Sequence, residues 1–291
     1  MPRATKVSRI SKGHGRLYKG VVQLLLLLAV VAYIFPFLLL VLNSFKTGGE
    51  IQSNPFSLPT RIDFSNIVAV IGLMNFARTF TNSLVVSAAS LALILATSAM
   101  CAYWLVRRAN RFNRTFFSVL VASMIVPFQS LMIPLIYIYG GKLGLIQTAA
   151  TEIPLLIFLY GGFGAPMSVF IYHGFIKSIP LGLEEASRID GCTPIQTFFL
   201  IVLPMLKPTT VSIFILNALW IWNDYLLPSL VLTKPEVFTM PIQMKMFNGT
   251  YFTDMAKLIP AMLLTILPLV FVYLFAQKSI IEGVTQGSVK G

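Results

Sequence analysis

Charged residues are scarce in this sequence, since Asp, Glu, Lys and Arg make up only 11% of its 291 residues. A soluble domain of average composition is about a quarter charged, because its surface faces water. The chain is instead 56% hydrophobic, with a mean hydropathy of +0.81. Several of its apolar runs are longer than the ~18 residues that indicate a membrane-spanning helix. The composition therefore predicts an all-α, polytopic membrane protein.

Motifs for catalysis and cofactor binding are also missing. The chain has two cysteines, Cys101 and Cys192, and two histidines, His14 and His173, which are too few for a disulfide framework or a metal cluster. Gly140-Gly141-Lys142 lacks the rest of a phosphate-binding loop, and no G-x-S-x-G, H-E-x-x-H or C-x-x-C occurs. We therefore expect no catalytic residue, cofactor or metal in this chain, and no ATP hydrolysis by this chain alone.

Apolar runs predict six membrane spans and three regions of the chain. The first run is too long for a signal peptide and is not followed by a small-residue cleavage site, so it is expected to be retained. The expected regions are a basic N-terminus over 1–19, a transmembrane domain over 20–279 and a C-terminal tail over 280–291. The six spans are expected near residues 20–43, 82–106, 115–138, 152–175, 209–232 and 259–279.

The net charge of +12 arises from basic residues that flank the spans. Of the 22 Lys and Arg residues, 15 fall on one side: the N-terminus, 107–114, 176–208 and the C-terminus. By the positive-inside rule, this side is cytoplasmic and contains both termini. Such clusters also contact anionic lipid head groups. The basic charge therefore indicates topology and lipid contact, and no nucleic-acid partner is expected.

One carboxylate, Asp224, falls within a predicted span, where an ionised group costs roughly 2.5–3.5 kcal/mol or more. It lies beside Asn223, about 22 Å along the fifth span and thus in its outer half. Two roles remain open: contact with a sugar-like solute in a polar pathway, and pairing across the bundle. Gln129 and Asn217 are weaker candidates for the pathway. A proton- or sodium-coupled carrier would usually show more buried acidic groups.

The connector over residues 178–208 is too charged to span a bilayer and too apolar for a free loop. Its four charges near residue 184 would cost on the order of 10 kcal/mol in the membrane. Pro180 followed by Glu184 predicts a helix start, with Leu183, Ala186, Ser187 and Asp190 on one face.

Gly191 is expected to end this helix, and Thr193-Pro194 to start an amphipathic second one. Such a helix-turn-helix fits both an interfacial helix on the bilayer and a docking element for a soluble partner. The residue spacing alone leaves both interpretations open.

These residues resemble the EAA loop of the membrane subunits of ABC importers. That pattern is E-A-A, two residues, D-G-A, eight residues and I-x-L-P. Here it reads Glu185-Ala186-Ser187, Asp190-Gly191-Cys192 and Ile201-x-Leu203-Pro204, with Ser187 and Cys192 in place of alanine. Over nearly its whole length the chain is similar to the maltose-type permease of carbohydrate importers, including Trp222-Asn223-Asp224 and the tail from residue 282.

The resemblance implies the type I ABC importer permease fold, with six transmembrane helices and a cytoplasmic EAA coupling helix-turn-helix. It implies a permease subunit of a binding-protein-dependent importer of sugars or related carbohydrates in a bacterial or archaeal cytoplasmic membrane. The expected partners are a homologous second permease, two cytoplasmic ATPase subunits and an extracytoplasmic solute-binding protein. In maltose-type systems the other permease makes most of the solute contacts.

The resemblance also assigns site residues. Contact with the binding protein is expected at Asn248, Gly249 and Thr250, and contact of the tail with the ATPase dimer at Gln286 and Gly287. Coupling to the ATPase is expected at Glu184, Glu185, Ala186, Ser187, Asp190, Gly191, Cys192, Ile201, Leu203 and Pro204.

Two other classes of protein remain as alternatives. A stand-alone secondary transporter or channel is the alternative, and solute flux by the purified single chain would favour it. A membrane-embedded enzyme comes third, because the sequence has no recognisable nucleophile or metal-binding set.

Overall fold

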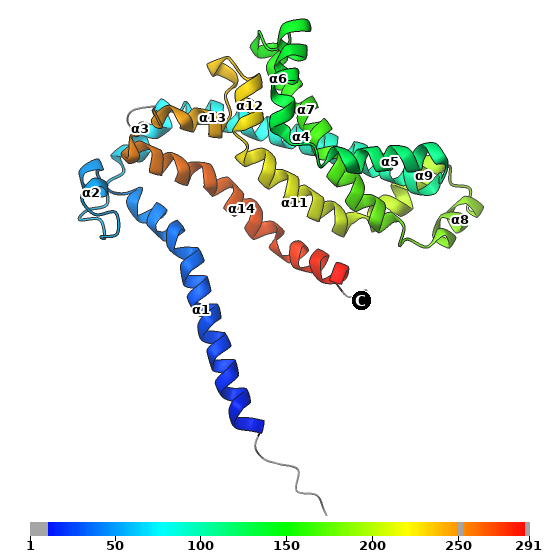
Figure 1. The fold of residues 1–291 in the computed structure, drawn as a ribbon, viewed down its shortest axis with the longest axis horizontal. Helices are drawn as coiled ribbons and strands as arrows, with labels where there is room; N and C mark the ends of the chain where they lie inside the picture. The colour runs from blue at the N-terminus through cyan, green and yellow to red at the C-terminus, as the bar shows by residue number, and fades with distance from the viewer. Residues whose placement is uncertain (1–10, 250–252, 289–291) are drawn as a thin grey trace, which may run out of the picture.

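The computed structural model describes residues 11–249 and 253–288, which form helices and one isolated bridge between Asn248 and Thr253, without a β-sheet (Figure 1). Four helices contain stretches long and apolar enough to cross a membrane. They are α1 (Ser11–Asn43), α4 (Phe76–Arg107), α7 (Ala149–Ile176) and α14 (Met255–Ser288). The all-α membrane fold is confirmed.

Two further spans are bent pairs of helices, so the total reaches six if each pair counts as one span. The first pair joins α5 (Arg111–Ser123) to α6 (Phe128–Leu135) and the π-helical η1 (Ile136–Lys142), with a bend of 96°. The second joins α9 (Pro194–Thr197), the π-helical η2 (Phe198–Val202) and α10 (Leu203–Met205) to α11 (Lys207–Asn223), with a bend of 73°.

These breaks alter two predicted spans. The expected span over 115–138 is interrupted after Ser123, because Pro127 adopts an extended ψ of 132° and has no N–H to continue the helix. The expected span over 209–232 ends at Asn223. Asp224 follows with an extended ψ of 126°, and the chain turns into the short α12 (Leu226–Val231). Asp224 therefore lies at a helix end rather than inside a continuous span.

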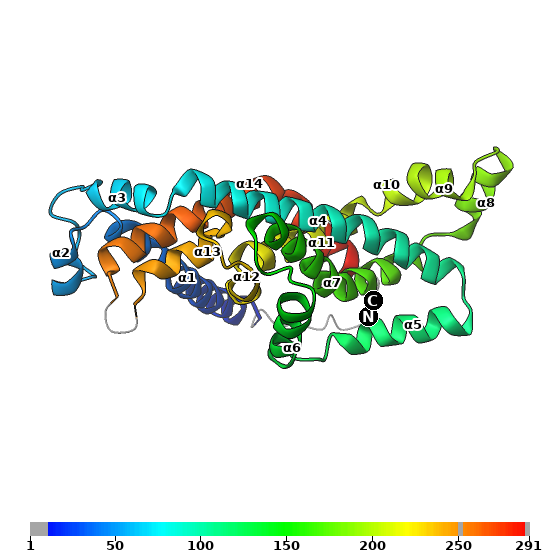
Figure 2. The same ribbon diagram turned by 90° about the horizontal axis from the view of Figure 1, so that it is seen from above.

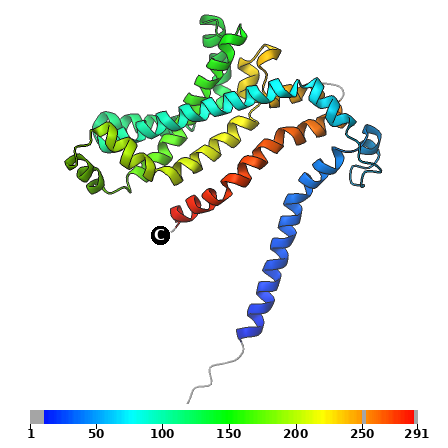
Figure 3. The same cartoon turned by 180° about the vertical axis from the view of Figure 1, so that it is seen from behind.

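Helices α4 and α7 form the centre of the molecule, and α11 lies against both. Figures 1 and 3 show α4, α7, α11 and α14 running side by side along the long axis. Two buried apolar clusters follow this axis. One contains Ile94, Leu156 and Leu227, and the other contains Ala102, Tyr172 and Val202.

Shorter elements complete the fold. Helix α3 (Ser65–Leu73) packs on α14 with α13 (Met240–Met244), around a third cluster that includes Met74 and Met240. The turns η3 (Pro235–Val237) and η4 (Lys245–Phe247) flank α13. Helix α14 continues to Ser288, beyond residue 279, where the sequence predicts the end of the last span.

Helix α1 diverges from the other helices (Figures 1 and 3), and the most apolar part of its span is 0% buried within the chain. A helix that is apolar all round is stable only in a nonpolar environment. The span of α1 is therefore built to be covered by lipid or by another chain.

The segment between α1 and α3 is held together by polar side chains around α2 (Gly48–Ser53). Lys46 is fully buried, and its Nζ donates to the carbonyl oxygens of Asn54 and Pro55, each at 3.2 Å. Thr47 and Glu50 form a capping box at the start of α2. Hydrogen bonds from Thr60 and Thr47 lower the pKa of Glu50 to about 2.

The lowered pKa of Glu50 predicts a pH window for this segment. Because the folded pKa lies below the ordinary value of 4.5, the stabilisation is complete above pH 4.5 and is lost as the pH falls toward about 2. Hydrogen exchange at residues 47–60, corrected for its intrinsic rate, should rise across this window. Glu50→Gln should show the faster exchange already at neutral pH, and unchanged exchange in this variant would contradict the role of the carboxylate.

The contact between α4 and α7 requires glycine at Gly164. A Cβ there would lie 2.5 Å from Cδ1 of Ile94 and 2.9 Å from Oδ1 of Asn217. Gly164→Ala should therefore destabilise the bundle by about 1–3 kcal/mol through overpacking. Gly162→Ala is the matched control, because its Cβ would meet nothing within 4 Å. Thermal unfolding in detergent compares the two, and equal midpoints would contradict this packing.

Candidate functional site

A helical hairpin made of α8 (Leu181–Ile189) and the α9–α10 segment lies at one end of the molecule, with α2 at the opposite end (Figure 2). We refer to it as the α8–α10 hairpin. Its turn contains Gly191 with a φ of +90°, a conformation that L side chains rarely adopt. Thr193 then caps α9 in a capping box with Gln196. The turn and the second helix start therefore lie where the sequence predicts them.

The predicted coupling residues divide into an outer and an inner set. Ser187 and Glu184 are buried, and the Ser187 hydroxyl lies 3.0 Å from that of Thr197, which joins α8 to α9. Cys192, Ile201 and Leu203 are half-buried. The exposed members are Glu185, Ala186, Asp190, Gly191 and Pro204.

Three of the four residues predicted to share one face of α8 are exposed. Leu183, Ala186 and Asp190 are exposed, whereas Ser187 points inward together with Glu184, three residues earlier. The physical reason is the carboxylate of Glu184, which turns toward a cation on α4 and rotates that side of α8 into the protein.

The cation is Arg107, in the last turn of α4. Its Nη2 and Nε lie 2.6 and 2.7 Å from Oε1 of Glu184, and the side chains are 14% and 2% exposed. The hydroxyl of Tyr103, one turn earlier, donates to Oε2 of Glu184 at 2.8 Å. The carboxylate thus has a charged partner and a neutral donor, as a buried charge requires.

Sequence reasoning missed this network. In the sequence, Arg107 belongs to a basic cluster that indicates topology, and Glu184 adjoins Glu185 among the residues expected to contact a partner. A signal was nevertheless present, because an arginine at the end of one predicted span and an acidic pair after another both fall on the predicted cytoplasmic side.

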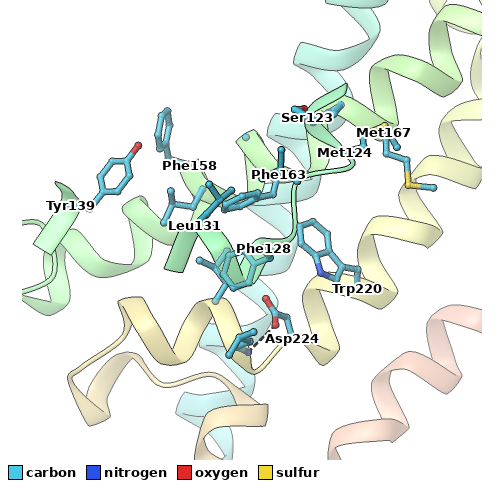
Figure 4. Close-up of a pocket in the computed structure, with 16 residues that line it drawn as sticks. Ser123, Met124, Phe128, Leu131, Tyr139, Phe158, Phe163, Met167, Trp220 and Asp224 are labelled. Carbon is cyan, nitrogen blue, oxygen red and sulfur yellow. Dashed lines mark hydrogen bonds between the residues drawn. The ribbon is translucent and has the colours of Figure 1, made fainter. Parts of the chain in front are cut away.

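A cavity of about 840 Å³ opens between α5, α6, α7, α11 and α12 (Figure 4). Its walls are mainly aromatic and aliphatic, and Asp224 is the carboxylate among its lining residues. The lining includes Met124, Phe128, Leu131, Tyr139, Phe158, Phe163, Met167, Trp220 and Asp224.

The carboxylate of Asp224 is held by two donors. Its Oδ2 accepts a hydrogen bond from the Tyr160 hydroxyl at 3.0 Å, and its Oδ1 accepts one from the Leu226 N–H at 2.9 Å. The second bond caps the turn into α12, and the first links α7 to the end of α11. Tyr160 also meets Trp220 edge-on, with ring centroids 5.4 Å apart. Asp224 thus pairs the end of α11 with α7 and also lines the cavity.

The other pathway candidates do not line this cavity. Asn217 is buried between α7 and α11, where its Nδ2 donates to the Ser168 hydroxyl at 3.2 Å and to the Ile213 carbonyl at 2.9 Å. It acts as a helix-packing residue. Gln129 is exposed on α6, outside the lining. Asn223 faces a second cavity of about 330 Å³, which Asn248 also lines.

The segment after α12 is tied to α4 and α7. Glu152, fully buried in the first turn of α7, accepts hydrogen bonds from the Thr233 hydroxyl at 2.6 Å and N–H at 3.0 Å. Asn82 on α4 donates to the carbonyl oxygens of Glu236 and Phe238. The segment is therefore an ordered part of the bundle.

The remaining predicted contacts lie at the edges of the described structure. Asn248 and Gly249 are exposed after η4, and Thr250 lies outside the described residues. Gln286 and Gly287 fall in the last turns of α14. Among the residues that the structure describes, no group of three or more His, Cys, Asp or Glu side chains is placed to hold a metal ion.

Apolar helices around a cavity, together with a charged hairpin at one end, define a polytopic helical membrane protein. A family model described as the inner membrane component of binding-protein-dependent transport systems matches residues 92–284. The chain belongs to this family, whose members are permease subunits of ABC transporters rather than enzymes.

Curated relatives are permeases of sugar transport systems. The chain is 36% identical to the probable starch degradation products transport system permease protein AmyC of Thermoanaerobacterium thermosulfurigenes, over 89% of this chain and 92% of the relative. It is 34% identical to the melibiose/raffinose/stachyose import permease protein MelC of Bacillus subtilis, over 93% and 96%. It is 32% identical to the diacetylchitobiose uptake system permease protein NgcG of Streptomyces coelicolor, over 98% and 93%.

The fold is shared with a solved structure. A chain of a bacterial ABC transporter involved in the import of the acidic polysaccharide alginate matches with a TM-score of 0.78 at 21% identity. The match covers 96% of this chain and 99% of that chain. At this identity, the likeness concerns the fold alone.

Proposed function

We propose that this chain is the permease subunit of an ATP-driven, binding-protein-dependent importer of sugars or related carbohydrates, and that it forms half of the translocation pathway. The observation that carries the proposal is the α8–α10 hairpin, which combines an exposed Glu185, a left-handed turn at Gly191 and exposed apolar side chains. The relatives named above, which transport sugars, support the solute class.

The exposed surface of the hairpin suits a protein partner. Ile189 and Ile195 are 87% and 71% exposed near the turn, and Leu200 is exposed on the second helix. Apolar side chains of this size are usually covered when they cluster at a surface. A cytoplasmic ATPase subunit would cover them, with a basic group facing Glu185. One ATPase subunit would serve this permease and a second ATPase the homologous permease.

The orientation follows from the charge distribution. The side that carries 15 of the 22 Lys and Arg residues, including both termini and the hairpin, would face the cytoplasm. Asn248, Gly249 and Thr250 would then face an extracytoplasmic binding protein, and Gln286 and Gly287 would approach the ATPase dimer.

The cavity offers chemistry that suits carbohydrate. Aromatic faces stack on the apolar C–H face of a sugar ring, and a carboxylate accepts hydrogen bonds from its hydroxyl groups. Trp220, Phe128 and Asp224 provide these groups within one cavity. We propose that the solute passes through this cavity or binds in it briefly. The second permease would close the open side of the cavity.

The coupling assignment is tested with Glu185→Ala and Gly191→Val. Glu185→Ala removes the exposed carboxylate, and Gly191→Val places a branched side chain at a φ of +90°, which costs about 1–3 kcal/mol of backbone strain. Both should abolish ATP-driven uptake and reduce co-purification of the ATPase while the permease still accumulates in the membrane.

Gly182→Ala is the matched glycine control, because its Cβ would meet nothing within 4 Å and its φ is ordinary. Normal uptake with normal ATPase association in the Glu185 and Gly191 variants would show that the hairpin is not the docking site. Solute flux through the purified chain without an ATPase would favour the stand-alone transporter.

The cavity assignment is tested with Trp220→Ala and Asp224→Asn. Asp224→Asn weakens a hydrogen bond to a charged group and should raise the KM for uptake about tenfold. Trp220→Ala removes a stacking face and should raise the KM by up to about tenfold. Gln129→Ala, exposed and outside the lining, is the control. Uptake kinetics in proteoliposomes containing the whole complex measure the effect, and an unchanged KM in both variants would remove this cavity from the solute path.

A further inference from the structure

We propose that Glu184 and Arg107 form a brace that fastens the α8–α10 hairpin to α4, so that displacement of the hairpin is passed directly to this helix. The inference rests on the proposed coupling function of the hairpin. It assigns to Glu184 a role different from that of its neighbour Glu185: Glu184 holds the hairpin from inside, whereas Glu185 faces the partner.

The two adjacent carboxylates have opposite surroundings. Glu184 is 1% exposed and bonds Arg107 and Tyr103 on α4. Glu185 is exposed, and within the part of the chain that the structure describes it makes no ion pair or side-chain hydrogen bond. The carboxylate of Glu184 is therefore paired with residues of this chain, and the carboxylate of Glu185 is available to bind another protein.

Arg107 connects three segments at one point. Besides binding Glu184 on α8, its Nη2 lies 3.3 Å from the carbonyl oxygens of Ile176, at the end of α7, and Ile179, in the link between α7 and α8. A planar guanidinium can serve several acceptors at once in a fixed geometry. The end of α4, the end of α7 and the first helix of the hairpin are consequently held in one arrangement.

The hairpin itself is closed by contacts around the brace. The Ser187 hydroxyl donates to the Glu184 carbonyl at 2.8 Å and lies 3.0 Å from the Thr197 hydroxyl. The ring of Tyr103 packs against Phe198 on η2, with centroids 5.1 Å apart. Both arms of the hairpin thus contact the same turn of α4.

Burial explains why the brace would persist through a transport cycle. Separating a buried ion pair leaves each charge without a partner in a nonpolar environment, which is far less favourable than breaking an exposed pair. Movement of the hairpin therefore carries α4 with it. Because α4 is packed tightly on α7, the displacement reaches both central helices.

The first test measures whether the hairpin and α4 move together. Spin labels at Ala109, two residues beyond the end of α4, and at Arg188 on α8, both exposed, are introduced into the assembled complex after Cys101 and Cys192 are replaced by serine. The distribution of distances between the two labels should be the same with and without ATP in the otherwise wild-type complex. The same distribution should broaden in the Glu184→Gln variant. A shift between nucleotide states in the otherwise wild-type complex would overturn the brace.

The second test measures uptake per ATP hydrolysed in proteoliposomes. Glu184→Gln should lower this ratio about tenfold, within the 5–150-fold range of typical couplings between sites, while co-purification of the ATPase is unchanged. Glu185→Ala should instead reduce co-purification. An unaltered ratio in Glu184→Gln, in an assay where the wild-type complex transports, would overturn the brace.

Tyr103→Phe keeps the test decisive if Glu184→Gln fails to accumulate. It removes one hydrogen bond to the same carboxylate and leaves the ion pair in place. The ratio of uptake to ATP hydrolysis should then fall by a smaller factor, and a wild-type ratio in this variant would count against the brace. Absence of ATP-driven uptake by the wild-type complex would count against the proposed function instead.

Discussion

The close packing of α4 on α7 is the interaction on which the rest of the structure depends. Gly161 and Gly164 let the side chains of Leu93 and Ile94 approach the backbone of α7, where a Cβ would clash. Small residues at such interfaces allow the many short contacts that hold helices together where lipid removes the hydrophobic driving force. Helices α4 and α7 thereby form a rigid centre. Helix α11 packs against this centre, and both ends of the molecule are held relative to it.

Buried carboxylates attach two peripheral segments to this centre. Glu152 holds the backbone after α12, and Glu184 holds the α8–α10 hairpin through Arg107. A buried charge is stable only with its donors in place, so each anchor fixes one geometry. The segment after α12 and the hairpin proposed to meet an ATPase are thus attached to the same two helices.

Broken helices create the cavity. Pro127 ends one helix before α6, and the extended residue Asp224 ends α11 before α12, so polar backbone groups become available within the apolar part of the molecule. Such groups are tolerated in a membrane where side chains or a cavity satisfy them. The Asp224 carboxylate does this for Leu226 and also lines the cavity. One residue therefore ends α11, caps the turn into α12 and forms part of the cavity wall.

The sequence by itself determined the membrane class, the all-α fold, the family and the hairpin turn, because hydropathy, charge scarcity, Gly191 and Thr193-Pro194 are local signals. Tertiary structure alone decided which residues face inward. It paired Glu184 with Arg107, placed Asn217 in helix packing and ended the fifth span at Asn223. These outcomes depend on contacts between segments far apart in the chain, as with the 77 residues that separate Arg107 from Glu184. Periodicity within one helix carries no information about such partners.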